Sequence, residues 1–257
     1  MKTLLLLGGC LWLAPVVAQE INTHLPLVRK MDAMRLPPED FTARVMVRKT
    51  KAGAAAGEDA NFRQYSRRRA GADGRVALDT LIVCDEPKRD AGKMILFVGD
   101  ACWFFDPRAK RATRMPAQQV ASQAFVADLM NWRFVDDFDH TKAGQEPVVS
   151  AGESHACSVL DFTPKAGMKN RPPLVRCWID SQGHPWKTEY YTASRKVFRS
   201  VLFEKYETVL GAERTTRLRV ESRGEVEEIT LSAIKTGSSP DDFFSPDQLP
   251  RLQITPR

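Results

Sequence analysis

Histidines, serines and paired carboxylates are the residues of this chain that could do chemistry. The four histidines fit neither an H-E-x-x-H pattern nor a cysteine spacing typical of zinc sites. They are His24, His140, His155 and His184. Residues 152–156, GESHA, are close to a G-x-S-x-G nucleophile elbow, but they end in Ala and precede a predicted strand instead of joining a strand to a helix. The pairs Asp136-Asp137 and Asp241-Asp242 indicate turns or helix starts rather than an acid/base couple. The sequence therefore makes no case for catalysis, and it predicts no enzyme, no cofactor and no metal site.

The N-terminus has the composition of a secretory signal peptide. Lys2 precedes an apolar run over residues 4–17, and small residues lie at the two positions that matter for cleavage, Val16 and Ala18. The run is too short to span a bilayer. We therefore expect residues 1–18 to be removed after Ala18, which leaves a periplasmic protein of one domain, residues 19–257. The net charge of +6 comes from 38 basic and 32 acidic residues, an excess too mild and too mixed to predict a nucleic-acid partner.

Four cysteines follow the signal peptide, and an even number in an exported protein favours disulfide bonds over a metal site. Cys157 and Cys177 lie at equal distances from Gly167, so we expect them to face each other across a hairpin and to form a disulfide. Closing that loop would contribute roughly 3 kcal/mol to stability. A predicted strand, 93–98, separates Cys84 from Cys102 in sequence, so these two either pair or pack as small hydrophobic residues.

The central stretch of the chain, residues 78–114, contains four short β-prone runs at 78–84, 93–98, 102–105 and 111–115. Polar turns separate them, among them Gly99-Asp100 and Asp106-Pro107. Connections this short exclude a parallel crossover, so the stretch predicts an antiparallel meander.

Further β-prone runs lie on both sides of this meander. Before it, residues 41–49 alternate apolar and polar side chains, and residues 61–69 form a mostly polar run. After it, six runs are separated by turn residues, at 156–163, 174–180, 186–192, 196–206, 215–222 and 225–234. Residues 134–140 are predicted as either a short strand or a loop.

Three helical segments are predicted from spacing and capping residues. Leu27, Met31 and Met34 recur at helical intervals before Pro37-Pro38. Residues 116–133 have helical spacing of apolar side chains and no Gly or Pro after the first residue, which predicts one or two helices. Near the C-terminus, Ser245 as N-cap with Pro246 at the first helical position predicts a short helix that runs through Leu249.

The order of turn, apolar and aromatic residues in the central meander resembles that of the outer-membrane lipoprotein-sorting (LolA/LolB-like) family. The matching residues are Pro87, Asp90, Gly92, Lys93, Gly99, Asp100, Trp103, Pro107 and Arg114. Two departures are the order Arg89-Asp90-Ala91-Gly92, where the family usually has Asp-Arg-Gly, and Phe105, where Tyr is common. The likeness continues through Cys157-x-x-Leu160, residues 177–180, residues 185–191 and Asp242-x-Phe244. Ser194-Arg195-Lys196 stands where Ser-Gly-Lys is frequent, which leaves that turn type open.

The resemblance implies a mainly β (α+β) fold, a single incomplete antiparallel β-barrel of about ten or eleven strands with helices that form a plug or lid. It also implies a cavity for acyl chains, although the same apolar side chains would serve an ordinary core closed by the helices. Burying each CH₂ of a chain gains about 0.8 kcal/mol. The predicted cavity residues are Val45, Val47, Phe62, Leu81, Val83, Met94, Leu96, Val98, Trp103, Phe105, Phe125 and Leu129.

Basic residues near strand ends are predicted to contact lipid headgroups, namely Arg44, Arg48, Arg67 and Arg114. The tight cluster Arg67-Arg68-Arg69 is either a solvated hairpin end or a contact for anionic headgroups.

The leading functional hypothesis is a non-catalytic, monomeric periplasmic carrier or chaperone. It would bind the acyl chains of lipoproteins, or another lipid, for sorting to the outer membrane. The resemblance implies an inner-membrane exporter and an outer-membrane acceptor as partners. The alternative hypothesis is an envelope-stress sensing or regulatory module on the same fold, which partners a membrane protein and resembles the N-terminal half of sigma-factor regulators. The absence of a second domain counts against the alternative.

Overall fold

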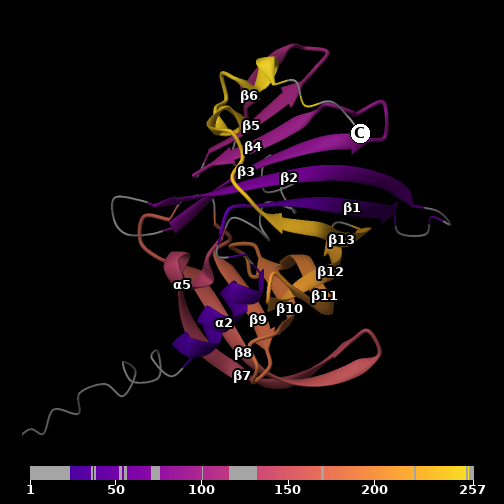
Figure 1. Cartoon of the computed structure of the whole chain (residues 1–257). Coiled ribbons are helices and arrows are strands. Elements are labelled where there is room, and N and C mark those ends of the chain that lie inside the picture. Colours follow the sequence, from indigo (N-terminus) through magenta and orange to yellow (C-terminus); the bar gives the residue numbers. More distant parts are fainter. Residues whose placement is uncertain are drawn as a thin grey trace, which may run out of the picture.

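Two consecutive meanders make up most of this protein, which we describe from a computed structural model (Figure 1). The first contains β1 (Phe41–Lys51), β2 (Glu58–Ala70), β3 (Val76–Glu86), β4 (Met94–Val98), β5 (Ala101–Asp106) and β6 (Arg111–Arg114). The second contains β7 (Phe138–Ser150), β8 (Glu153–Pro164), β9 (Leu174–Ile179), β10 (Pro185–Tyr191), β11 (Val197–Val209), β12 (Ala212–Ser222) and β13 (Glu225–Thr236). The structure describes residues 24–254 except 36, 38, 52, 53, 55, 56, 71–75, 100, 116–131, 169, 170, 223 and 253.

Pairing of the first strand with the last joins the two meanders into one antiparallel sheet. Across this junction Val45 of β1 lies opposite Leu231 of β13 on one side and opposite Phe62 of β2 on the other. The 13 strands of the described residues follow the order β6-β5-β4-β3-β2-β1-β13-β12-β11-β10-β9-β8-β7. Within this part of the chain the sheet does not close, because β6 and β7 lie at its two edges.

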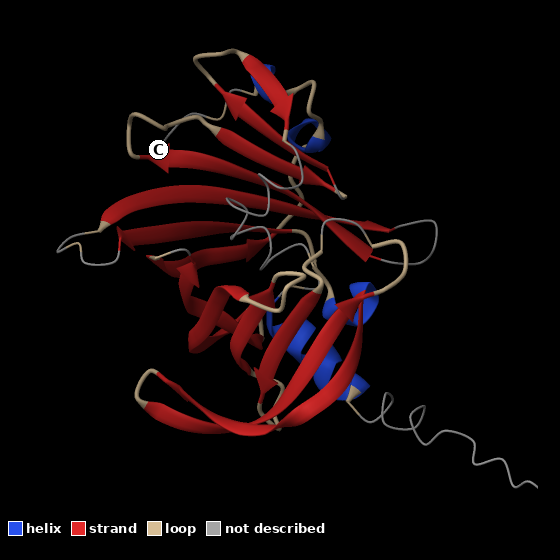
Figure 2. Cartoon of the chain, turned by 180° about the vertical axis from the view of Figure 1, so that it is seen from behind, coloured by secondary structure: helices blue, strands red, loops and turns tan. Residues whose placement is uncertain are grey.

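Few helices occur among the described residues, and each packs on one of the two meanders (Figure 2). The helix α2 (Leu25–Arg35) and the single turn α5 (Phe134–Asp137) lie against the second meander. Two 3₁₀ turns, η1 (Asp241–Phe244) and η2 (Leu249–Arg251), lie against the first. We call the sheet surface that faces α2 the inner face, and the opposite surface the outer face.

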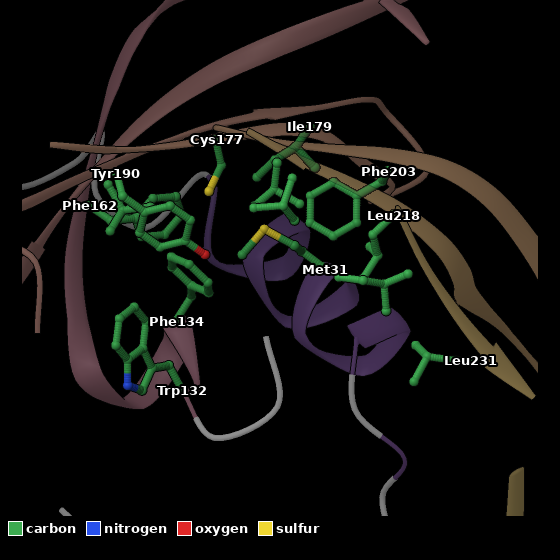
Figure 3. Packing of buried hydrophobic residues seen from close by; sticks show 14 of the residues in the cluster. Met31, Trp132, Phe134, Phe162, Cys177, Ile179, Tyr190, Phe203, Leu218 and Leu231 are labelled. Carbon is green, nitrogen blue, oxygen red and sulfur yellow. The ribbon is translucent and has the colours of Figure 1, made fainter. Parts of the chain in front are cut away.

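The α2 helix forms because Leu27, Val28 and Met31 recur on one side of it, and this side packs on the inner face. Val28 and Met31 are completely buried there. Met31 lies between Ile179, Phe203 and Leu218, whereas Trp132, Phe134 and Tyr190 fill the adjacent space (Figure 3). This half of the inner face is therefore an ordinary protein core with a helix in it.

The predicted mainly β fold, an incomplete antiparallel sheet with helices against it, is confirmed, although the sheet has more strands than the ten or eleven expected. One of the additional strands is β7, because residues 134–140 were expected to form only a short strand or a loop. The chain instead makes the turn α5 and then the strand Phe138–Ser150. Charged residues, Gly144 and Pro147 interrupt the apolar alternation of this edge strand, so its sequence does not mark it as a strand.

The predicted C-terminal helix from Ser245 to Leu249 is wrong. The backbone N–H of Ser245 bonds to the carbonyl oxygen of Asp242, so Ser245 closes the turn η1 instead of capping a new helix. The predicted signal peptide, 1–18, and most of the predicted helical segment, 116–131, lie outside the described residues.

Candidate functional site

A cluster of apolar side chains on the inner face of the first meander is the candidate site. Phe62 on β2 lies opposite Cys84 on β3, and Ile82, which shares a face with Cys84, lies opposite Ile95 on β4. Ile82, Phe97 and Cys102 form its buried centre, and Phe62, Ile95 and Met115 pack around them. We call these six residues the inner-face cluster. Within the described part of the chain its members come from the sheet and from Met115 directly after β6, and none comes from a helix.

Seven of the predicted cavity residues lie on the outer face instead. They pair across the sheet with one another, for example Leu81 with Leu96 and Leu96 with Trp103. Phe244 and Leu249, from the C-terminal turns, pack over them. The seven are Leu81, Val83, Met94, Leu96, Val98, Trp103 and Phe105. The described residues of the predicted cavity set therefore do not share one face of the sheet.

The remaining predicted cavity residues divide between the α2 core and undescribed sequence. Val45 and Val47 belong to the buried cluster around α2. Phe62 packs against both that core and the inner-face cluster. Phe125 and Leu129 lie outside the described residues.

A row of polar side chains crosses the inner face between the α2 core and the inner-face cluster. Gln64 lies between Ala43 on β1 and Ile82 on β3, and Ser66 lies opposite Thr80. Gln64 Nε2 donates to Ser66 Oγ over 2.9 Å, and Ser66 Oγ lies 3.1 Å from Thr80 Oγ1. All three side chains are 0% exposed. Sequence analysis missed them, although the spacing of Gln64 and Ser66 from Phe62 is the period-two signal that marks one strand face.

All four arginines predicted to contact headgroups lie on the outer face. Arg44 and Arg48 alternate with the buried residues of β1 and are exposed. Arg48 pairs with Asp59 over 2.7 Å. The guanidinium of Arg114 lies 5.9 Å from the ring centre of Trp103, its partner in the β5–β6 register.

Arg67 anchors the C-terminal segment to the sheet. Its guanidinium donates to the completely buried Asp79 over 3.1 Å and to Asp241 over 2.7 Å. It also lies 4.4 Å from the ring centre of Phe244. Asp79 further accepts from Arg69 and from the backbone N–H of Gly99. Arg67 is thus an internal contact that holds η1 over the outer face.

The four cysteines are all buried and unbridged. Cys157 packs on the outer face with Val159 and Trp178, whereas Cys177 belongs to the inner core beside Thr188. The predicted disulfide between Cys157 and Cys177 is therefore wrong, because the sheet separates the two side chains. Cys84 and Cys102 share the inner face, but they lie on β3 and β5 with β4 between them, which makes the packing alternative correct.

A buried carboxylate joins α2 to α5. The Asp32 carboxylate accepts from the backbone N–H groups of Phe134 and Val135 over 3.1 and 3.0 Å and from Arg35 over 3.3 Å. Burial raises the pKa of Asp32, against the opposing effects of Arg35 and the two N–H groups. The contact fixes α5 against α2, and a hydrogen bond from Arg35 to the carbonyl oxygen of Trp132 holds the residues just before α5.

The histidines do not gather into a metal site. Within the described residues, no group of three or more His, Cys, Asp or Glu side chains is placed to hold a metal ion. His155 stacks on Trp186 with ring centres 3.4 Å apart, and His184 bonds Asp180 and Glu213 over 2.9 and 3.1 Å. Ser154 lies within β8, not at a strand-to-helix turn.

Comparison with known proteins places the fold. A family model whose description reads only "Uncharacterized protein" matches residues 78–251. No curated protein matches the sequence significantly. No helix among the described residues combines the length and the apolar character needed to cross a bilayer.

Three solved structures share the fold across nearly their whole length. A DUF1329 family protein from Desulfovibrio piger superposes with a TM-score of 0.75 at 22% identity, over 90% of this chain and 99% of that one. A LolA superfamily protein from Nitrosomonas europaea gives 0.70 at 23% identity, over 86% and 97%. A domain from Vibrio parahaemolyticus, described as an outer membrane lipoprotein-sorting protein, gives 0.70 at 19% identity, over 88% and 98%. The fold predicted from the central meander is therefore confirmed.

Proposed function

The chain belongs to the family whose model covers residues 78–251 and has the fold of the LolA superfamily, and from this premise we propose that it is a carrier for acyl chains. The chains would lie on the inner face of the first meander and be held by the inner-face cluster. The carrier would act in the periplasm after removal of residues 1–18, without a catalytic step. The lipoprotein-sorting description of the Vibrio domain supports lipoproteins as the source of the chains.

One observation carries the proposal. The apolar clusters of the sheet differ in whether a described helix or 3₁₀ turn packs on them. α2 and α5 cover the core on the second meander, and η1 and η2 cover the outer face of the first. No described helix or 3₁₀ turn packs on the inner-face cluster, although Ile82, Phe97 and Cys102 at its centre are buried. Ile82 and Phe97 are each 5% exposed, so an acyl chain would reach them and the neighbouring Phe62 by separating the side chains that pack on this face.

The free energy of burying an acyl chain also supports a non-covalent lipid carrier. Each buried CH₂ gains about 0.8 kcal/mol. A chain with roughly fourteen such groups therefore gains on the order of 10 kcal/mol before the costs of ordering it are subtracted. Burial on this scale holds a lipid in water without a covalent bond, and handing the lipid to an acceptor needs only a second apolar surface. An inner-membrane exporter and an outer-membrane acceptor would be the corresponding partners.

The experiment compares two neighbouring residues of β4 that face opposite ways. After lipid extraction, the purified protein is titrated with a fluorescent fatty acid, and native mass spectrometry before extraction records any lipid that co-purifies. Phe97→Ala should weaken acyl binding roughly tenfold, a change of about 1.4 kcal/mol. Leu96→Ala removes a similar apolar group from the outer face and should leave the affinity unchanged. The proposal fails if no lipid co-purifies and the extracted protein binds no fatty acid.

A further inference from the structure

The buried polar row of the inner face has one atom that its own hydrogen bonds do not account for. Gln64 Nε2 donates a hydrogen bond to Ser66 Oγ, and Ser66 Oγ also lies within hydrogen-bond distance of Thr80 Oγ1. Gln64 Oε1 is buried, and it accepts no hydrogen bond from any described residue. A buried carbonyl oxygen without a donor costs free energy, of the order of 1–3 kcal/mol. The fold therefore maintains an acceptor on this face that it does not itself satisfy.

The side chains on the two strands beside Gln64 give this atom no donor. Ser66 holds the nitrogen side of the planar amide, which sets Oε1 on the opposite side of the group. Ala43 and Ile82 flank Gln64 on the two adjacent strands and offer no side-chain polar atom. Ile82 also belongs to the inner-face cluster. The unsatisfied acceptor thus adjoins the cluster with which hydrocarbon is proposed to pack. Because Gln64 is 0% and Ile82 5% exposed, a ligand would reach the acceptor when this cluster opens.

We propose that Gln64 Oε1 accepts a hydrogen bond from an N–H group at the head of a bound acyl chain. The inference rests on the proposed function and gives it a ligand class, chains linked to their head by an amide rather than by an ester. An ester lacks the hydrogen, so an ester-linked chain leaves the buried acceptor unpaired. Sites that place a buried polar group against a ligand discriminate against analogues that lack its partner. Ser66 and Thr80 act by orienting the Gln64 amide.

The test uses two ligands that differ by one atom. N-(2-hydroxyethyl)palmitamide and 2-hydroxyethyl palmitate have the same chain and the same hydroxyl, and N–H in the first is replaced by O in the second. Each displaces a fluorescent fatty acid from the lipid-extracted full-length protein. The wild-type protein should bind the amide about 2- to 10-fold more tightly, the range expected for one net hydrogen bond.

Variants locate the preference. Gln64→Leu should bind both ligands with equal affinity, because it removes the acceptor and keeps an apolar side chain of similar length. Ser66→Ala should reduce the preference by freeing the Gln64 amide to rotate. Gln182→Leu makes the same chemical change in an exposed turn and should retain the wild-type preference.

The outcomes separate this inference from the proposed function. If neither ligand binds, both fall. If both bind equally to the wild-type protein, or the ester binds more tightly, acyl binding stands and the role of Gln64 is overturned. The wild-type comparison decides this even if Gln64→Leu does not fold. An N-palmitoylated peptide measured beside N-(2-hydroxyethyl)palmitamide then separates two sources of the chain. Tighter binding of the peptide indicates a lipoprotein N-terminus, and tighter binding of N-(2-hydroxyethyl)palmitamide indicates a free amide lipid.

Discussion

Leu160 of β8 lies directly opposite Cys177 of β9. Side chains that are directly opposite in an antiparallel pair point to the same face, so Cys177 shares the inner face with Leu160. Cys157 is three residues from Leu160, an odd number, and so points to the outer face. A hairpin centred on Gly167 would have paired Cys157 with Cys177 and put both on one face. In the observed register the partner of Cys177 is Leu160, an odd number of residues from Cys157, so the two cysteines point to opposite faces.

This register predicts that the folded protein contains no disulfide between these cysteines. Unfolding the chain of residues 19–257 in denaturant without reductant should expose four titratable thiols. In the folded protein they should react slowly, because burial raises the pKa of Cys157 to about 11 and of Cys177 to about 12, which keeps both thiols protonated. A count of two thiols, with a cross-linked peptide containing both residues in mass spectrometry, would contradict the register.

The alternation of side chains between the two faces of a strand also explains which features were predictable from the sequence. The short turns of the central meander and the alternation in β1 were sufficient to predict most strands and their antiparallel order. The face of each side chain was not predictable where a strand is buried on both sides. Leu81, Ile82, Val83 and Cys84 are four consecutive buried residues, so their apolar character does not tell inner from outer. Only the pairing with β2 and β4 assigns Leu81 and Val83 to the outer face and Ile82 to the inner one.

The apolar side chains that Phe244 and Leu249 cover on the outer face of the first meander should contribute to stability and not to lipid binding. Phe244 is buried among Leu81, Leu96 and Phe105, so Phe244→Ala should lower the free energy of unfolding by about 3–5 kcal/mol. Urea denaturation measures this loss. The affinity for a fluorescent fatty acid, measured under conditions where the variant remains folded, should be unchanged. A large loss of acyl affinity in the folded variant would place ligand on the outer face and contradict the site.

The link between α2 and α5 should depend on the Asp32 carboxylate. Asp32→Ala removes the acceptor for the Phe134 and Val135 N–H groups and leaves Arg35 buried without this partner, so we expect a loss of about 3–5 kcal/mol in the free energy of unfolding. Asp136→Ala is the control. Its pair with Arg133 is partly exposed and should be worth at most about 1 kcal/mol. Equal effects of the two substitutions in urea denaturation would refute the link.

Asp180 should make stability fall in acid. Its partial burial would raise its pKa, but hydrogen bonds from Trp186 and His184 outweigh burial and lower the pKa below the ordinary value. A carboxyl group with a lowered folded-state pKa contributes stability above its unfolded pKa and loses that contribution as pH falls through the folded pKa. Unfolding free energies measured from about pH 5 to about pH 2 should therefore decline, and Asp180→Asn should reduce the decline. An identical pH profile for the variant would count against this assignment.

The central claim concerns which face of the first meander holds lipid, and photo-cross-linking tests it most directly. A fatty acid with a diazirine in its chain is bound to the lipid-extracted protein, irradiated, and the modified residues are identified by peptide sequencing in a mass spectrometer. We expect labels on Ile82, Phe97 and their inner-face neighbours, and none on Leu81 or Leu96, which are adjacent to them in sequence but point away. Labels on Leu81 and Leu96 without labels on Ile82 and Phe97 would contradict the account.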